Sequence, residues 1–310
     1  MSLIKNKQPD SLATSPSEPG HAPLTRLPSF YQPVDETQRE SLYRDYVGFL
    51  GRRNGDMDFE RRRYSKREAH LATLAGSRAL FDGRFDADLF RRQYARYDRG
   101  QETDAAMQLL LLFCKVNAGE AFGVEVMREA RKAYFERSEA QYQAERIIAN
   151  EEEYHTKLLL GATQYFGVRM DQAFVPPLPL RIFIHGLAKM PQRFFHSVLL
   201  AAEFSGIYLF NTLLHVTRRV MRDQPEVRDA MEERLCAVLV DEIGHVTYNR
   251  LALGSGGLRV ARWLYPLVQK SVASQPEFVA LRQYAEDAPS VAELDYRHLP
   301  EEVRRQAFFI

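Results

Sequence analysis

The chain has 310 residues, of which 42 are Lys or Arg, 41 are Asp or Glu and 45% are apolar. This composition is typical of a globular protein of one large or two small domains. The formal net charge is +1, so the chain lacks the excess of basic residues that is typical of nucleic-acid-binding proteins. Cys114 and Cys236 lie in apolar, helix-like runs and predict reduced thiols in a cytoplasmic protein. Because no apolar stretch reaches roughly 18 to 20 residues and the N-terminus lacks a signal-peptide core, neither an integral membrane position nor secretion is expected.

The N-terminal segment differs in composition from the rest of the chain. Residues 1–34 are rich in Pro, Ser, Thr and Gly, which bury little apolar surface, so we expect a flexible tail there. From residue 35 onwards Ala, Leu, Arg, Glu and Gln dominate, and no β-branched run alternates with polar residues. We therefore predict a single all-α domain over residues 35–310, whose first, short helices lie near 36–51, 66–80 and 86–98.

Two long helices are predicted in the region that follows. Residues 103–166 are too long for one helix without internal caps. Ser138 and Gln141 have the S-x-x-Q spacing of a capping box, which predicts a new helix start. We therefore divide this region into helices over 103–135 and 138–165.

Two further long helices are predicted after a connection. Residues 167–190 are rich in Pro and Gly, which predicts a long connection across the end of a bundle. The third long helix is expected over 191–221, and the fourth runs from Pro225 to about 253, before Gly254. Shorter helices near 258–272 and 276–286 follow it.

Two Glu-x-x-His pairs lie on predicted long helices, Glu152 with His155 and Glu242 with His245. A spacing of three places both side chains of a pair on one helical face. A carboxylate and an imidazole that point together into a helical core form half of an iron or manganese site, so two pairs predict one dinuclear centre. A third match, Glu18 with His21, lies in the proline-rich tail, where no helix aligns the side chains. The motif alone is therefore weak, and its helical context gives it weight.

The other two long helices each offer a carboxylate at the matching height. Glu120 precedes the break near 136–138 by about as much helix as separates that break from Glu152, roughly 24 Å on each side. Glu203 and Glu242 likewise lie on either side of Asp223, at nearly equal distances along the chain. Glu120 and Glu203 also share their helical faces with apolar residues, which predicts that both point inward.

The order Glu, Glu-x-x-His, crossover, Glu, Glu-x-x-His over residues 103–253 resembles the ferritin-like dinuclear carboxylate proteins, which are four-helix bundles. The resemblance implies that two irons are held by six residues: Glu120, Glu152, His155, Glu203, Glu242 and His245. It implies bridging roles for Glu152 and Glu242. The acid before each of these two is similar to one that bonds a ligand histidine in the oxygen-activating branch. We assign that role to Asp241, whereas Glu151 has either that role or a solvated position within a run of three acids.

Several branches of this superfamily are compatible with the residues. The chain resembles the p-aminobenzoate N-oxygenases in size, helical lead-in and ligand order, but Val238 stands where those enzymes have a further histidine ligand. Acyl-carrier-protein desaturases share the E-E-x-x-H and D-E-x-x-H forms. Quinol oxidases share the ligand pattern and have an interfacial helix comparable to residues 174–195, for which a proline-rich connection is the simpler interpretation. A radical-storing ribonucleotide reductase subunit is disfavoured because Leu159 replaces its tyrosine, and iron storage or ferroxidase activity is the weaker alternative.

The resemblance implies an O2-activating non-haem diiron oxygenase that hydroxylates or N-oxygenates a small-molecule or carrier-bound organic substrate, or alternatively an acyl-desaturase-like diiron oxidase. It implies two Fe ions, or Mn in their place, with O2 as co-substrate. An electron-donor protein and a homodimer are compatible with it, and a nucleic-acid partner is not expected. Gly119, Gly123 and Gly206, beside the ligand faces, predict either room for substrate or close helix packing. Four aromatic residues line such a pocket or, more simply, belong to the core: Phe122, Tyr154, Tyr208 and Tyr248.

Overall fold

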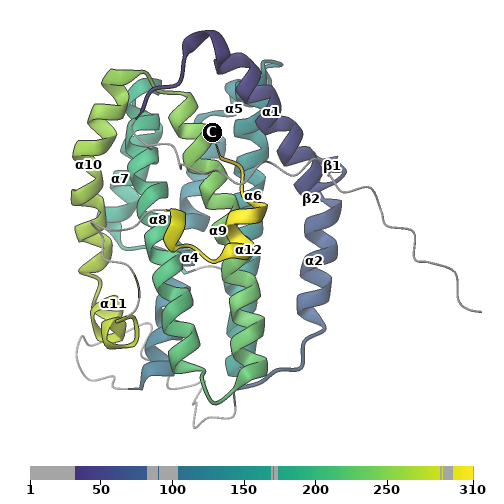
Figure 1. The fold of residues 1–310 in the computed structure, drawn as a ribbon, viewed down its shortest axis with the longest axis vertical. Coiled ribbons are helices and arrows are strands. Elements are labelled where there is room, and N and C mark those ends of the chain that lie inside the picture. Colours follow the sequence, from purple (N-terminus) through teal and green to yellow (C-terminus); the bar gives the residue numbers. More distant parts are fainter. Residues whose placement is uncertain are drawn as a thin grey trace, which may run out of the picture.

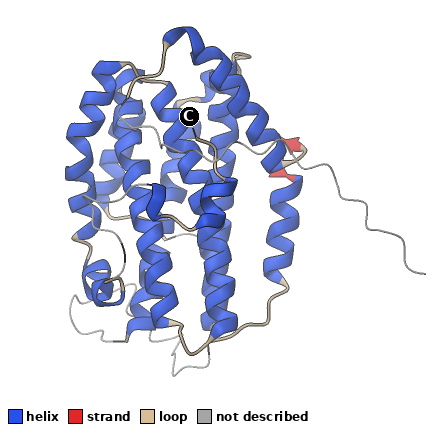
Figure 2. Cartoon of the chain, viewed as in Figure 1, coloured by secondary structure: helices blue, strands red, loops and turns tan. Residues whose placement is uncertain are grey.

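The computed structural model describes residues 32–81, 90, 104–168, 170, 174–286, 288 and 296–309. Within these residues the chain is almost entirely helical, which confirms the predicted all-α class (Figures 1 and 2). Residues 1–31 of the tail expected over residues 1–34, and the helix expected near 86–98 apart from Phe90, lie outside the described residues.

Four long helices occupy the centre of the molecule (Figure 1). They are α4 (Ala105–Ala130), α6 (Ala140–Ala162), α8 (Gln192–Val220) and α9 (Pro225–Leu251). Helix α4 packs on α6, α6 on α9, α9 on α8 and α8 on α4, so the four enclose one apolar core. We call them the central helices, and their bounds agree with the four predicted long helices within a few residues.

The ends of the central helices are specified partly by local sequence. The Asp104 side chain caps α4 by accepting hydrogen bonds from the backbone N–H groups of Ala106 and Met107, at 2.8 and 3.2 Å. Pro225 occupies the first turn of α9, where its missing N–H costs nothing. The predicted Ser138–Gln141 capping box is wrong, because Glu139 is the N-cap of α6 and makes no side-chain capping bond.

The N-terminal elements cover the outer side of α6 and α9. Helix α1 (Glu36–Asn54) packs on both, and α2 (Ser65–Ala75) packs on α6. Between them strands β1 (Met57–Asp58) and β2 (Arg63–Tyr64) form a small antiparallel hairpin that the sequence did not predict. Two-residue strands are too short to show an alternating pattern, which explains the omission.

The connection between α6 and α8 contains a helix, so describing residues 167–190 only as a connection was wrong. A short 3-10 segment, η1 (Thr163–Phe166), extends α6, and Gly167 then adopts a left-handed conformation with φ of 69°. Helix α7 (Leu178–Ala188) follows and packs mainly on α4. Pro177 and Pro179 lie at its N-terminus, where proline is compatible with a helix.

The C-terminal helices pack around the outside of the central helices. Helix α10 (Ser255–Ala273) lies along α8, and α11 (Pro276–Leu281) lies on α4. Two 3-10 segments, η2 (Arg282–Tyr284) and η3 (Tyr296–His298), precede α12 (Glu301–Gln306), which contacts α9. Gly254, expected to end the fourth long helix, is instead the N-cap of α10.

Among the described residues one helix, α8, has the length and apolar composition needed to cross a membrane. Most of that helix is buried inside the protein, and it carries Glu203. A core helix of a globular protein has the same properties, so this composition alone does not indicate a membrane span.

Candidate metal centre

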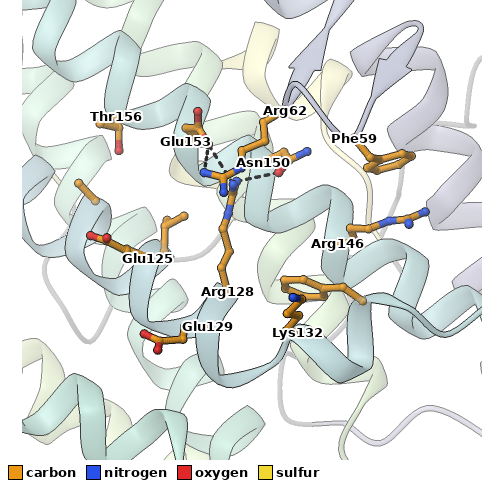
Figure 3. Close-up of a pocket in the computed structure, with 13 residues that line it drawn as sticks. Phe59, Arg62, Glu125, Arg128, Glu129, Lys132, Arg146, Asn150, Glu153 and Thr156 are labelled. Atoms are coloured by element: carbon orange, nitrogen blue, oxygen red, sulfur yellow. Dashed lines mark hydrogen bonds and ion pairs between the residues drawn. The ribbon is translucent and has the colours of Figure 1, made fainter.

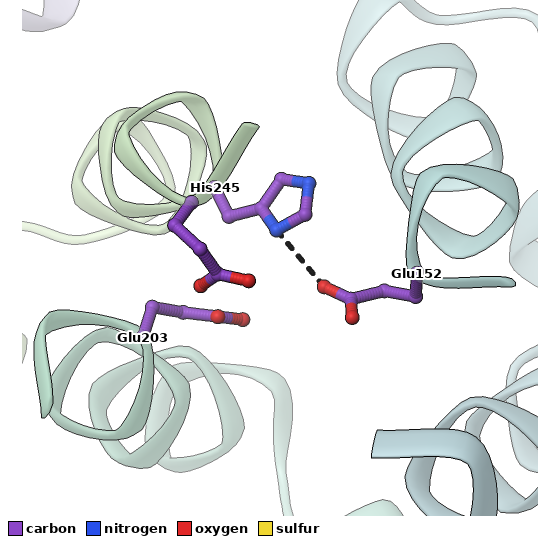
Figure 4. Close-up of side chains that lie close together, drawn as sticks. Glu152, Glu203 and His245 are labelled. Atoms are coloured by element: carbon purple, nitrogen blue, oxygen red, sulfur yellow. Dashed lines mark ion pairs between the residues drawn. The ribbon is translucent and has the colours of Figure 1, made fainter. Parts of the chain in front are cut away.

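The structure brings all six predicted ligand residues into two groups that share Glu152. One group consists of Glu152, Glu203, Glu242 and His245, and the other consists of Glu120, Glu152 and His155. Within each group, one potential ligand atom per residue lies within 4.8 Å of every other. Every central helix contributes at least one of these side chains, and Figure 4 shows Glu152, Glu203 and His245 converging from three of them. The six residues that counting placed at matching heights therefore lie close together in space.

Glu152 and Glu242 both face imidazole nitrogens. The Oε1 atom of Glu152 lies 2.9 Å from Nδ1 of His245, the pair joined by the dashed line in Figure 4, and its Oε2 atom lies 3.6 Å from Nδ1 of His155. The Oε1 atom of Glu242 lies 3.4 Å from the same Nδ1 of His155. Both glutamates therefore lie between the two halves of the cluster, at the positions where bridging carboxylates are predicted.

Each histidine is held by an acidic residue from the opposite helix. Nε2 of His155 on α6 lies 3.2 Å from Oδ2 of Asp241 on α9. Conversely, Nε2 of His245 on α9 lies 3.4 Å from Oε2 of Glu151 on α6. The contact predicted for Asp241 is confirmed. For Glu151 the solvated alternative is wrong, because that side chain is fully buried.

This arrangement leaves the second nitrogen of each imidazole facing the cluster. The Nδ1 atoms of His155 and His245 lie at ion-pair distances from cluster carboxylates but without normal hydrogen-bond geometry. Oε2 of Glu120 is buried and has no hydrogen bond within the described residues. A carboxylate at Nε2 favours the tautomer with the proton on that nitrogen, which leaves the Nδ1 lone pair available to a metal ion. Two imidazole nitrogens and four carboxylates are a donor set that suits divalent iron or manganese.

Two arginines and an asparagine from the N-terminal helices hold the supporting acids. Arg67 Nη2 donates to Oε1 of Glu151 at 2.8 Å and to Oδ1 of Asp241 at 2.7 Å. Arg53 Nε donates to the same Asp241 oxygen at 2.5 Å, and the Asn54 amide donates to Glu151 at 2.8 Å. Sequence reasoning missed all three residues, because α1 and α2 carry no motif that points to the central helices.

Pairing shifts the pKa values of Asp241 and Arg67 in the directions that keep both groups charged. Burial opposes ionisation of Asp241, but Arg53 and Arg67 hold the pKa of its carboxyl well below the ordinary value. Burial likewise opposes the charge of Arg67, yet Asp241 and Glu151 raise the pKa of its guanidinium above the ordinary value. Asp241 is therefore a permanent acceptor for His155 at neutral pH.

The glutamates of the cluster differ in their affinity for a proton. Burial, reinforced by the charges of Glu152 and Glu242, raises the pKa of Glu120 well above its ordinary value. Burial and the same two neighbours raise the pKa of Glu203 in the same way. Burial also opposes ionisation of Glu152, but the adjacent imidazoles, His245 foremost, hold its pKa below the ordinary value.

The two histidines favour the protonated form despite burial. Burial lowers the pKa of His155, but the adjacent carboxylates of Asp241 and Glu152 outweigh it, and the resulting pKa is well above the ordinary value. The pKa of His245 is raised well above the ordinary value for similar reasons, chiefly through Glu152. Protons and a divalent cation therefore compete for the same atoms.

The cluster side chains from α9 are buried, whereas those from α4 and α8 are partly exposed to solvent. Glu242, His155 and His245 are buried, whereas Glu120 and Glu203 retain partial exposure. A methyl group at Gly123, one turn beyond Glu120, would meet no atom within 4 Å. This supports the prediction of room beside the cluster at Gly123.

Gly206 favours the close-packing interpretation instead. A methyl group at that position would lie 3.3 Å from Oε2 of Glu242, closer than ordinary van der Waals contact. Helix α8 therefore approaches the carboxylate of α9 closely at this point. Gly119 is intermediate, with Leu180 of α7 at an ordinary contact distance of 3.9 Å.

Three of the four aromatic residues considered for a pocket, together with His196, belong to the core. Tyr208 packs on Phe278, and the Tyr248 hydroxyl donates to Glu145 at 3.3 Å. His196 is buried and lies 2.9 Å from the Asn249 amide oxygen. These positions agree with the core interpretation. Tyr154 is also buried in the core, although one side of it lines a surface pocket. Phe122 differs, since it is only partly buried and contacts His185 edge-on.

Two surface pockets lie near the cluster without including its six residues. The larger, of about 700 Å³, lies between α4, α6 and the hairpin, where Arg128 pairs with Glu153 at 3.1 Å and bonds Asn150 (Figure 3). The smaller pocket, of about 460 Å³, is lined in part by Arg53 and Arg67, which hold the supporting acids. Arg67 links the second pocket to the cluster, because the two acids that it contacts also contact His155 and His245.

Comparison with protein-family models, with curated proteins and with solved structures finds no match for this chain. The interpretation of the cluster therefore depends on its own geometry and chemistry.

Proposed function

We propose that the chain is a ferritin-like dinuclear carboxylate protein that binds two iron ions and oxidises an organic substrate with O2. The observation that carries this proposal is the pair of buried Nδ1 atoms, on His155 and His245, that lie 2.9 to 3.6 Å from carboxylate oxygens of the cluster without normal hydrogen-bond geometry. An imidazole oriented through its other nitrogen and directed at carboxylates is typical of a metal ligand.

The donor set also fits the charge of two divalent ions. When ionised, Glu120, Glu152, Glu203 and Glu242 carry four negative charges, which two divalent cations neutralise in a buried site. The shared position of Glu152 suits an ion on each side of it. If iron is bound there, these residues would hold it, and the ferrous form would supply electrons for the reduction of O2.

The residues of the chain have distinct tasks in this proposal. Asp241 and Glu151 would keep the histidine protons on Nε2, so that each Nδ1 would be available to hold a metal ion. The buried α9 side excludes water, and the partly exposed α4 and α8 side leaves an approach for a substrate near Gly123. Hydroxylation, N-oxygenation and desaturation all use such an approach, and a small or carrier-bound substrate suits it.

Metal analysis after anaerobic loading with Fe(II) tests the proposal. We expect about two irons per chain in the unmodified protein, with O2 consumed on mixing and a new near-ultraviolet absorption band. Glu152→Ala removes the shared ligand and should lower the iron content, whereas Glu125→Ala, an exposed acid on the same helix as Glu120, should not. Unchanged iron binding in Glu152→Ala contradicts the proposal, and many irons per chain would favour the storage alternative.

A further inference from the structure

Exposed apolar side chains gather in and around α7. Ile182 is 63% exposed and Phe183 is 50% exposed, although both lie within a well-formed helix. The opposite face of α7 is buried through Ile184 and Leu187, so the helix is anchored on the protein by one side only. Further exposed apolar residues of the same segment are Val175, Leu178, Leu180, Met190 and Phe194. Patches of this kind mark surfaces that bind a protein or a membrane.

The same segment carries positive charge and no acid. Between Val175 and Ala202 the sequence has no Asp or Glu, whereas it contains Arg181, Lys189 and Arg193. Lys189 and Arg193 are exposed and follow directly on the apolar face of α7. The surface thus combines apolar side chains with a cationic rim.

Helix α10 has the same character. It contains no acidic residue, and its exposed side includes Trp263, the only tryptophan of the chain, and Leu267. Basic residues flank them at Arg259, Arg262 and Lys270. Both α7 and α10 pack against α8, and both lie at the same edge of the molecule in Figure 1.

We propose that α7, the first turn of α8 and the outward side of α10 form a docking surface for an anionic lipid bilayer. An amphipathic helix with large apolar residues and a cationic rim binds such a surface by inserting its apolar face between headgroups while the cations meet anionic lipids. Tryptophan is favoured at the same depth, because its ring is apolar and its N–H is polar. This proposal is independent of the proposed oxidase activity.

A second copy of the chain fits this surface less well. A two-fold contact places each patch against its own copy, so Lys189 and Arg193 would face other cations with no acid from the same patch to neutralise them. Anionic headgroups supply the missing negative charge along the whole surface. The charge balance therefore favours lipid over self-association.

Vesicle flotation with the full-length protein tests the proposal. We expect the protein to float with phosphatidylcholine vesicles that contain phosphatidylglycerol, and to remain in solution with phosphatidylcholine alone or at high salt. The emission of Trp263 should shift to shorter wavelength on binding, because it is the sole tryptophan and is 68% exposed. An unmodified protein that stays in solution with anionic vesicles, or an unshifted emission when it floats, overturns the proposal.

Charge substitutions separate the docking surface from general effects. The double variant Ile182→Glu/Phe183→Glu should lower vesicle binding by about tenfold or more, and Lys189→Glu/Arg193→Glu should lower it comparably. Leu80→Glu is the matched control, because Leu80 is 60% exposed outside this surface, and it should bind like the unmodified protein. Equal loss in Leu80→Glu, or a lipid-independent dimer in size-exclusion chromatography that Ile182→Glu/Phe183→Glu dissociates, contradicts the proposal.

Discussion

Nε2 of His155 on α6 lies 3.2 Å from a carboxylate oxygen of Asp241 on α9, which links the two helices through a buried pair. The reciprocal contact, between Glu151 on α6 and His245 on α9, makes the arrangement nearly symmetric. Each helix therefore supplies one ligand pair and the acid that orients the imidazole of the other pair. This relationship leads to the predictions that follow.

Asp241→Asn should weaken iron binding in the folded protein. An amide can turn its NH2 group toward Nε2 of His155, which favours the tautomer whose proton lies on Nδ1, the nitrogen that faces the cluster. We expect about 10- to 100-fold lower affinity for Fe(II), measured by anaerobic titration. Asp229→Asn is the control, because Asp229 is largely exposed and pairs with Arg228 away from the cluster, and the affinity of this variant should be unchanged. Equal affinity in both variants would show that Asp241 does not orient a ligand.

Arg67→Met should destabilise the folded protein. The guanidinium is buried between Glu151 and Asp241, so its removal leaves two buried carboxylates with less positive charge nearby. We expect a loss of about 3 to 5 kcal/mol in the free energy of unfolding, measured by urea denaturation. Arg44→Met, in an exposed pair with Glu40, should change that free energy by less than about 1 kcal/mol. A small effect at Arg67 would mean that Arg53 alone compensates both acids.

Iron binding should release protons and strengthen as pH rises. The pKa values of Glu120, Glu203, His155 and His245 are all raised, so each group binds protons more tightly than usual, and an incoming cation must displace them. Affinity should therefore fall as the pH is lowered below neutrality. Titration calorimetry in buffers of different ionisation enthalpy measures the protons released. An affinity that does not change with pH contradicts this protonation pattern.

Gly206→Ala should weaken Fe(II) binding, whereas Gly123→Ala should stabilise the protein and retain Fe(II) binding. The new methyl group at position 206 presses on Oε2 of Glu242, so we expect weaker Fe(II) binding. At position 123 the methyl group meets open space, and alanine should stabilise α4 by about 1 kcal/mol with metal binding retained. Thermal unfolding and Fe(II) titration of the two variants provide the comparison. Reduced metal binding in Gly123→Ala would assign that position to the ligand environment.

The ligand-bearing helices could be predicted because their information is local and periodic. A spacing of three residues places Glu152 beside His155 whatever surrounds the helix, and the constant rise per residue allowed the heights of Glu120 and Glu203 to be counted. The apolar neighbours of these acids correctly indicated their inward direction. The Asp241 contact was expected from the resemblance of the D-E-x-x-H segment to the oxygen-activating branch, and the structure contains that contact.

Only the tertiary structure decided what lies around these helices. Arg53, Asn54 and Arg67 reach the cluster from α1 and α2, and Arg67 is 174 residues from the Asp241 that it contacts. No periodicity in the sequence records such a distant contact. Glu151 was ambiguous for the same reason, because its burial depends on those side chains.

The surface around α7 also has some properties that the sequence predicts and others that only the tertiary structure decides. Its apolar composition and its lack of acids are written in the sequence, but an apolar helix is equally suited to a core. Packing on α4 buries one side of α7 and leaves Ile182 and Phe183 exposed. By itself, the sequence determined the four central helices and the six residues that meet between them, because helical geometry repeats. Which residues support that cluster, and which apolar face remains open, depends on long-range packing that only the folded chain establishes.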